Sequence, residues 1–292
     1  MAGDDDQTIY GFQGADPNCF MQQEGERDDQ EVSRRVPRSV HREAIKILNQ
    51  LTTRIDKKWI PRDAEGKVYP NYVLDEIDFS KGEWMILART NKLLLNISEH
   101  FYSLGVRFTG KTNKYLPNSI LEAYRVWTRL NQGAFVSGEE AQTVYQYLVV
   151  KKGHLARGFS DGKSLQNETS VDLDKLKSHH GLLISGDWRQ LHLPEDTKEY
   201  MQTLLERGDT LMEKSKIKLL TLHGSKGKEC ENVCLFTDYG TEGQDEFIYR
   251  SAYENPDAEH RLFFVGTTRA KENLYIMQPN SDYFYTIGEP IV

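Results

Sequence analysis

The sequence has little cysteine, no long apolar run and no excess of positive charge. Its three cysteines, Cys19, Cys230 and Cys234, are odd in number and lack the spacing of a zinc site. Together with the lack of a secretory segment at the start, this pattern favours the reducing cytoplasm. No apolar stretch approaches the roughly 18 residues needed to cross a membrane. The sequence therefore predicts a cytoplasmic protein without a membrane partner.

The charge and length of the chain leave several functions open. The net charge of −7 argues against a broadly basic coat for nucleic acid, but a local basic groove remains compatible with it. A chain of 292 residues is long enough for two compact units, or for one domain interrupted by another. With 38% hydrophobic and 11% aromatic residues it can form real cores.

Two stretches have the pattern of ligand-binding turns in an α/β domain. In residues 218–229 an apolar run ends in a turn bracketed by glycines, which indicates a buried strand and an exposed loop. Ligands of α/β domains bind beyond such strand ends. In residues 259–270 a helix-period segment ends in a small-residue turn that presents Arg269, and a strand is expected over 274–277. Arginine suits a phosphate because its fork of donors is always charged.

These stretches read Thr-Leu-His-Gly-Ser-Lys-Gly-Lys-Glu at 221–229 and Arg-Leu-Phe-Phe-Val-Gly-Thr-Thr-Arg-Ala at 261–270. The chain resembles the C-terminal half of superfamily 1 DNA helicases of the UvrD/Rep/PcrA type, in their fifth and sixth motifs. The resemblance implies an α/β fold: the second RecA-like lobe of a P-loop NTPase, a parallel sheet flanked by helices, with a mostly helical insertion. It implies four segments: the truncated end of the first lobe with a linker (1–31), the second lobe (32–117 and 217–292), and an accessory insertion (118–216).

The first residues resemble the third helicase motif. In this alignment Gln7 senses the terminal phosphate or the attacking water, because its amide can both accept and donate. Tyr10 and Phe12 offer flat faces for unpaired bases. Gln13 stands where the family often has arginine, which puts a phosphate or DNA contact there in doubt. From the residues alone, an acidic turn followed by two core aromatics is the alternative.

Residues 32–41 resemble the fourth motif. Aligned on its Arg-Val-Pro, Arg35 is a phosphate-binding arginine, and Arg34 replaces the tyrosine that stacks on adenine. Arg38 is the rival for the phosphate contact, since Pro-Arg-Ser also matches a common form of the motif. The alternative for all three arginines is a solvated entrance to a helix that begins after Pro37.

A buried strand over 84–88 is expected to place Arg89 and Asn91 at its carboxyl end. In the family, the matching residues contact the backbone of single-stranded DNA, and helix capping is the alternative. The resemblance also places His223 on the DNA strand and Glu229 on the nucleotide ribose. It assigns Lys226 to coupling the two sites, although a simple salt bridge would explain it equally well.

Residues 105–112 satisfy the spelling of a phosphate-binding loop, ending in Gly-Lys-Thr. Such a loop needs a strand before its first glycine and a helix after its threonine. The pattern here predicts a helix before Gly105, a strand-like segment over 106–109 and an interruption at Pro117. A true phosphate loop using Lys111 is therefore the least favoured interpretation.

Outside these motifs the sequence predicts structure but no recognisable chemistry. Residues 52–81 are expected to form loops with short extended pieces. Adjacent His179 and His180 are interpreted as surface residues, and no metal site is predicted. Further expectations are helices near 120–130, 139–150, 172–178 and 196–206, a strand over 232–236, and an irregular loop over 238–256.

The resemblance implies the C-terminal part of an ATP-dependent 3′–5′ helicase that steps along single-stranded DNA and acts at single-strand/duplex junctions. Gln7, Arg35 and Arg269 are the expected catalytic residues, with ATP and Mg²⁺ as cofactors. No credible phosphate-loop lysine and no upstream Asp-Glu pair occur, so the isolated chain is expected to be inactive or to need a separate N-terminal half. The alternative is a non-catalytic DNA-binding or regulatory module derived from a helicase.

Overall fold

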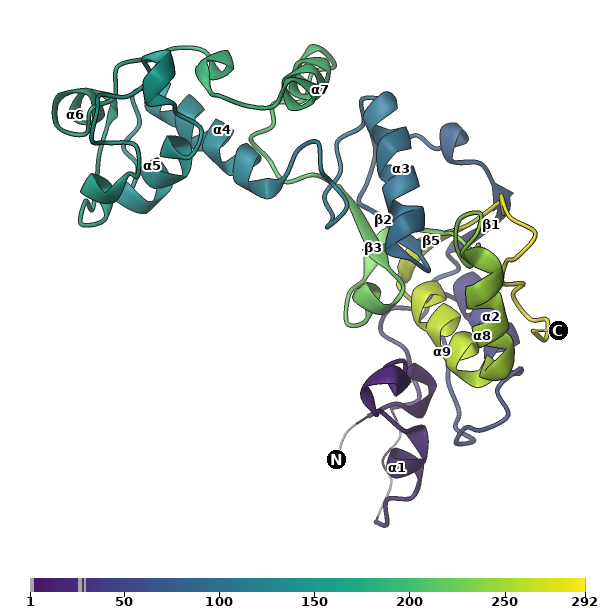
Figure 1. Cartoon of the computed structure of the whole chain (residues 1–292). Helices are drawn as coiled ribbons and strands as arrows, with labels where there is room; N and C mark the ends of the chain where they lie inside the picture. The colour runs from purple at the N-terminus through teal and green to yellow at the C-terminus, as the bar shows by residue number, and fades with distance from the viewer. Residues whose placement is uncertain (1–2, 26–27, 29, 292) are drawn as a thin grey trace. The chain divides into compact units, whose positions relative to one another are not determined.

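A computed structural model describes residues 3–25, 28 and 30–291 of the chain (Figure 1). The chain divides into two compact units. The first comprises residues 1–101, 110–112 and 215–292, and the second comprises residues 102–109 and 113–214. The second unit thus begins at residue 102, earlier than the insertion at 118–216 that the sequence suggested.

The first unit is built on a five-stranded parallel sheet. Its strands lie in the order β1-β5-β4-β2-β3, and every neighbouring pair is parallel. Strand β2, which lies between β4 and β3, is buried along its whole length, as its uninterrupted apolar sequence requires. The strands are β1 (Lys67–Tyr72), β2 (Trp84–Ala88), β3 (Ile217–Thr221), β4 (Cys230–Leu235) and β5 (Ala270–Met277). The α/β fold expected from the sequence is confirmed.

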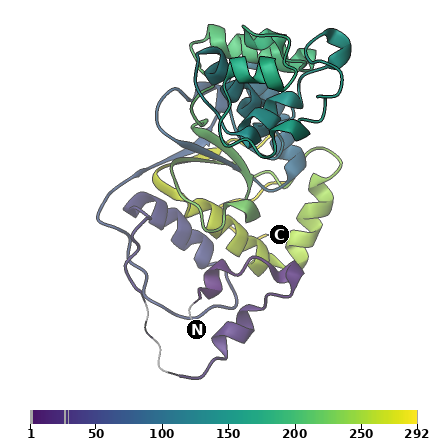
Figure 2. The same ribbon diagram turned by 90° about the vertical axis from the view of Figure 1, so that its left-hand side faces the viewer.

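Helices flank this sheet. Helices α2 (Arg38–Leu48) and α9 (Pro256–Thr267) pack side by side (Figure 2). Their apolar residues form one core with those of β4 and β5. A Cβ added at Gly266 would lie 2.4 Å from Leu222 Cδ2, so only glycine allows α9 to approach the end of β3 this closely. The other helices of this unit are α1 (Pro17–Met21), α3 (Asn91–Ser103) and α8 (Asp245–Glu254).

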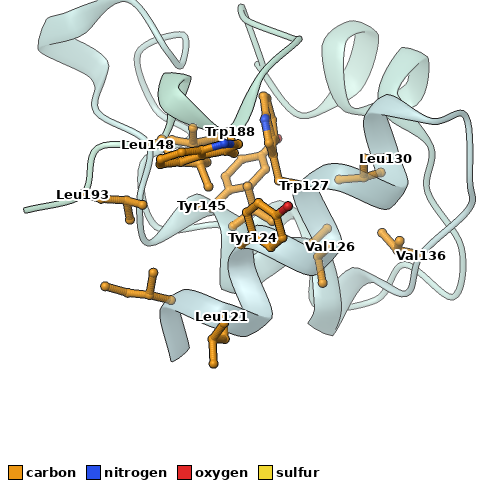
Figure 3. Packing of buried hydrophobic residues seen from close by; sticks show 14 of the residues in the cluster. Leu121, Tyr124, Val126, Trp127, Leu130, Val136, Tyr145, Leu148, Trp188 and Leu193 are labelled. Atoms are coloured by element: carbon orange, nitrogen blue, oxygen red, sulfur yellow. The ribbon is translucent and has the colours of Figure 1, made fainter. Parts of the chain in front are cut away.

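The second unit is mostly helical, as the sequence predicted. Its core gathers large aromatic side chains, among them Trp127, Tyr145 and Trp188 (Figure 3). A capping box between Ser137 and Glu140 begins one helix: each side chain bonds to the backbone N–H of the other residue. Its helices are α4 (Asn118–Asn131), α5 (Gly138–Tyr145), α6 (Leu173–His179) and α7 (Glu195–Glu206).

Several local predictions were wrong. Residues 238–256 were expected to be an irregular loop, yet they contain α8, a helix whose exposed surface leaves little apolar signal. The short extended pieces expected within residues 52–81 are confirmed by β1, which lies at the edge of the sheet. Residues 106–109 do not form one of the strands of the sheet. The helix expected over 139–150 is shorter and ends at Tyr145. Among the described helices, none has both the length and the apolar character that crossing a membrane would require.

Candidate functional site

The N-terminal segment is held by charges gathered around Lys57. The ammonium Nζ lies 2.6 Å from Asp4 Oδ1, 2.5 Å from Asp5 Oδ1 and 3.0 Å from Asp6 Oδ2. Arg54 makes a second pair with Asp6 at 3.0 Å. Burial raises the pKa of Asp5. The hydrogen bonds that its carboxylate accepts from Lys57 and from the backbone N–H of Ile55 together outweigh burial, so the net shift of the pKa is downward. The three carboxylates lie close enough to hold a metal ion, but Lys57 already supplies their counter-charge.

This anchoring places Gln7 against Arg269. Arg269 Nη2 donates to Gln7 Oε1 at 3.4 Å and to Thr268 Oγ1 at 3.0 Å. Its Nε and Nη1 donate to the backbone oxygens of Val265 and Lys228, at 2.7 Å and 3.2 Å. The sequence predicted a turn that presents Arg269, but the side chain is only 1% exposed. The turn instead folds the guanidinium back onto the end of α9.

Arg35 lies beside this cluster. Its Nε donates to the backbone oxygen of Thr268 at 2.6 Å, and its Nη1 lies 3.9 Å from Glu229 Oε2. Burial and the charge of Arg35 lower the pKa of Arg269 to about 9, while Glu229 and Asp4 oppose the shift. Arg269 therefore stays charged at neutral pH. Two partly desolvated guanidinium groups can bind an anion, with Glu229 and Asp4 offsetting part of their charge.

A cavity of about 900 Å³ opens next to these residues. Gln7, Arg35 and Thr268 line it, together with Lys57, Lys58 and five acidic residues: Asp4, Asp5, Asp6, Glu24 and Asp28. Arg269 is not among the described lining residues, but it donates hydrogen bonds to two of them, Gln7 and Thr268. Contact between Arg269 and a ligand in the cavity would therefore require a local rearrangement.

The neighbouring arginines point elsewhere. The guanidinium of Arg38 forms an ion pair with Asp63 at the surface, and Arg34 is exposed. Of the three arginines at the start of α2, Arg35 is the one found among the lining residues of the cavity. Stacking of Arg34 on a nucleotide base stays a prediction.

Lys226 and Tyr10 join the N-terminal segment to the turn after β3. Lys226 Nζ donates to the backbone oxygen of Gln7 at 2.8 Å and lies 5.2 Å from the centre of the Tyr10 ring. Tyr10 Oη donates to the backbone oxygen of His223 at 3.2 Å, and the two rings lie 6.1 Å apart. One cluster thus connects the residue expected at the phosphate with two residues expected at DNA.

The other candidates for DNA contact lie at the carboxyl end of β2. Arg89 forms a bidentate pair with Glu259, with Nε–Oε1 and Nη2–Oε2 distances of 2.7 Å and 3.3 Å. Asn91 is exposed at the start of α3, while Thr90 Oγ1 accepts a hydrogen bond from a helical N–H and so caps this helix. The side chain of Phe12 lies outside the part that the structure describes.

A known protein family matches the part of the chain that includes His223, Lys226, Glu229 and Arg269. Residues 193–281 match the UvrD-like helicase C-terminal domain. The chain contains a UvrD-like helicase C-terminal domain. It is also similar to a probable DNA helicase of Mycoplasma pneumoniae, with 32% identity over 97 residues. That similarity covers 31% of this chain and 17% of the relative, so the chain matches less than a fifth of that helicase's length.

The matched helicase domain does not include every residue of the cluster. Gln7, Arg35 and Arg89 lie outside residues 193–281. Their place at the site rests on contacts with the matched region: Gln7 with Arg269, Arg35 with Thr268, and Arg89 with Glu259. The helicase resemblance and the packing of this unit therefore select the same face of the molecule.

Three residues that support the candidate site were not selected from the sequence. Lys57 neutralises the N-terminal carboxylates, and Glu259 pairs with Arg89. Arg261 is buried, and its Nε donates to the backbone oxygen of Asp5 at 3.1 Å. Glu259 and Arg261 are charged residues next to the apolar residues of α9. That position is the one local signal that could have identified them as buried residues.

Residues 105–112 do not form a phosphate loop. Helix α3 precedes Gly105, which has a φ of +57° and follows the end of that helix. The hydroxyl oxygens of Thr112 and Ser98 lie 2.7 Å apart, and the next helix begins only after Pro117. The strand–loop–helix order that a phosphate loop requires is absent from this stretch.

The interpretation of His180 as a surface residue was wrong. The side chain is buried, with Nδ1 3.0 Å from Ser164 Oγ and Nε2 3.3 Å from Glu168 Oε1. Adjacent His179 is exposed. The C-terminal end of α6 turns the second histidine inward, so the pair provides one structural and one solvent-facing side chain.

The turn after β3 makes stability depend on pH through His223. Burial and the charge of Arg89 lower its pKa from 6.5 to about 4, so the unfolded chain binds this proton at a higher pH than the folded one. The contribution of neutral His223 to the free energy of unfolding is complete above about pH 6.5 and is lost as the pH falls towards 4. We expect His223→Gln to reduce the fall in the free energy of unfolding between pH 7 and pH 5, measured by urea denaturation. Equal losses in both proteins would contradict the assignment.

Proposed function

We propose that this chain is the C-terminal part of an ATP-dependent DNA helicase that steps 3′ to 5′ along single-stranded DNA. The observation that supports it most is the contact of Gln7 and Arg35 with the Thr268–Arg269 turn beside a cavity. Two guanidinium groups and an amide are the donors that a terminal phosphate requires. The neighbouring Glu229 suits the ribose hydroxyls.

Hydrolysis would use these residues to stabilise charge. As negative charge builds up on the phosphoryl oxygens, Arg35 and Arg269 would oppose it, and Gln7 would orient the attacking water. Release of the hydrogen bond between Gln7 and Arg269 would free both groups for the phosphate. Mg²⁺, when bound with ATP, would supply positive charge that offsets the negative charge of the phosphates. The Asp4–Asp6 cluster, already paired with Lys57, does not suit the ion, so its ligands would come from another lobe.

Coupling to DNA would pass through Lys226. This residue holds the backbone of Gln7 and lies against Tyr10, which in turn bonds to the backbone of His223. A displacement of Gln7 by a phosphate would therefore shift groups expected to stack on or hydrogen-bond to DNA. Neutral His223 would act as a hydrogen-bonding or stacking group and not as a cation. The substrates would be single strands and single-strand/duplex junctions, in the cytoplasm.

The second candidate function is a non-catalytic DNA-binding or regulatory module derived from a helicase. Two observations favour it: Arg269 is buried, and residues 105–112 do not have the geometry of a phosphate loop. Such a module would keep the DNA-facing residues Tyr10, Arg89, Asn91 and His223 without any need for nucleotide.

A comparison of ATP hydrolysis with and without a first lobe separates the two. We expect no DNA-stimulated phosphate release from this chain alone, measured with malachite green, because the residues that the structure describes provide neither a phosphate loop nor a suitable magnesium site. Addition of a first RecA-like lobe with a phosphate loop should restore hydrolysis. Robust activity of the chain alone would contradict the proposal, and Lys111→Ala would then test residues 105–112. No activity in the mixture would favour the non-catalytic module.

A further inference from the structure

A second cavity, of about 1030 Å³, lies at the carboxyl ends of β1, β4 and β5. Its walls are residues 72–75 after β1, one side of α3, residues 240–243, the first turn of α8 (245–247) with Arg250, and residues from 277 to 283 around the end of β5. Among the described residues, it shares no lining side chain with the cavity beside Arg35. Carboxyl ends of parallel strands are where α/β domains bind ligands, and the proposed function leaves this one unused.

The cavity is strongly acidic. Two of its carboxylates are paired, Asp75 with His100 and Glu246 with Arg250. The other four have no ion-pair partner in the part of the chain that the structure describes. A cavity of this charge repels DNA phosphates and attracts cationic groups. The six acidic lining residues are Asp75, Asp238, Glu242, Asp245, Glu246 and Asp282.

Asp238 provides a second, independent sign of a ligand. It is 1% exposed, and its Oδ1 accepts hydrogen bonds from the N–H groups of Asn280 and Ser281, at 2.7 Å and 2.9 Å. Its Oδ2 is buried without a hydrogen-bond partner among the described residues, and so is Thr241 Oγ1. Burial raises the pKa of Asp238, and nearby Asp245 adds to the shift. A buried carboxylate oxygen without a donor is costly, and a cation in the cavity would relieve that cost.

The remaining lining suits a long side chain more than a bare ion. Leu93, Ile97, Phe236 and Met277 provide apolar surface of the kind that covers the methylene stem of lysine or arginine. At the rim Phe247 is 77% exposed. The cavity's carboxylates are dispersed: within the described ranges, three acidic ligands close enough for one metal ion occur only at residues 4–6. Dispersed charge over a large cavity matches an extended polycation.

We propose that this cavity binds a basic, extended segment of a partner protein. One lysine or arginine side chain of that segment enters between Asp238 and Asp245, and its cationic end offsets the charge of these two carboxylates. Adjacent basic residues lie against Glu242 and Asp282 at the rim. This inference does not depend on ATP hydrolysis, because the site is separate from Gln7, Arg35 and Arg269.

Fluorescence anisotropy of the full chain with two labelled peptides tests the proposal. The probes are fluorescein-labelled Ala-Arg-Lys-Leu-Arg-Lys-Ala and its acidic counterpart Ala-Asp-Glu-Leu-Asp-Glu-Ala. We expect saturable binding of the basic peptide and none of the acidic one. Asp238→Asn and Asp245→Asn should each raise Kd about ten-fold or more, because each removes a charge-assisted contact.

Glu254→Gln is the matched control. This residue is exposed at the end of α8 and does not line the cavity, yet its loss changes the net charge equally. We expect its Kd to stay within about two-fold of the wild-type value. Should Asp238→Asn fail to fold, the exposed rim variants Glu242→Gln and Asp282→Asn replace it and should also weaken binding. Equal effects of cavity and control variants, or displacement of the peptide by Mn²⁺ or a thymidine oligonucleotide, would overturn the proposal.

Discussion

Replacement of Arg269 by lysine is expected to lower DNA-stimulated ATP hydrolysis by about 10³–10⁵-fold in the chain completed by a first lobe. Lysine keeps the charge but has no planar fork, so it cannot hold Val265, Lys228 and Gln7 and still reach a phosphate. The measurement is the steady-state rate of phosphate release at saturating ATP and DNA.

The controls for this prediction distinguish chemistry from folding. Arg35→Ala should also lower the rate by orders of magnitude, because this residue lines the cavity. Arg38→Ala should stay within about two-fold, since its guanidinium pairs with exposed Asp63 at the surface. Unfolding curves of all variants should be compared with the wild type. A properly folded Arg269→Lys enzyme with a normal rate would remove Arg269 from the mechanism.

The largest expected effect on stability comes from the pair between Arg89 and Glu259. Burial raises the pKa of the Glu259 carboxyl, and Arg89 is the charge that opposes this shift. Arg89→Met would leave Glu259 buried without a counter-charge. We expect the first unit to lose about 3–5 kcal/mol of unfolding free energy, measured by equilibrium urea denaturation at pH 7.

A second substitution separates the charge effect from lost packing. The double variant Arg89→Met/Glu259→Gln should recover most of the loss, because it removes the uncompensated charge. Arg42→Met is the matched control, since its pair with Glu65 is exposed on both sides and should cost less than about 1 kcal/mol. If Arg89→Met lost as little unfolding free energy as the Arg42→Met control, the buried Glu259 carboxylate would not depend on Arg89.

The parts of the fold that the sequence predicts well are those with a strong apolar pattern. Strand β2 was predicted at its observed bounds, because its five residues are apolar and all buried. Strand β1 was predicted only as a short extended piece without bounds, because it lies at the sheet edge, contains Pro70 and is nowhere fully buried. Helix α8 was missed for a related reason: only Asp245 and Ala252 are buried along it.

The residues of the candidate site also fall into two groups: those that the sequence could identify and those that it could not. Gln7, Arg35 and Arg269 could be selected because each stands in a motif with fixed local spacing. Their supporting partners could not, since Lys57 pairs with residues about fifty positions away and Glu259 pairs with Arg89 across 170 positions. The burial of Arg269 could not be predicted from its sequence neighbours either. Its guanidinium is buried because it donates to the backbone oxygens of Val265 in α9 and of Lys228 before β4.

Discrimination between ATP and ADP tests the central claim most directly. The chain completed by a first lobe should bind a non-hydrolysable ATP analogue more tightly than ADP, as measured by isothermal titration calorimetry. The account predicts that Arg35→Ala and Arg269→Lys abolish this preference while affinity for ADP changes little, and that Arg38→Ala leaves it intact. A preference for the triphosphate that survives in both the Arg35 and the Arg269 variants would contradict the account.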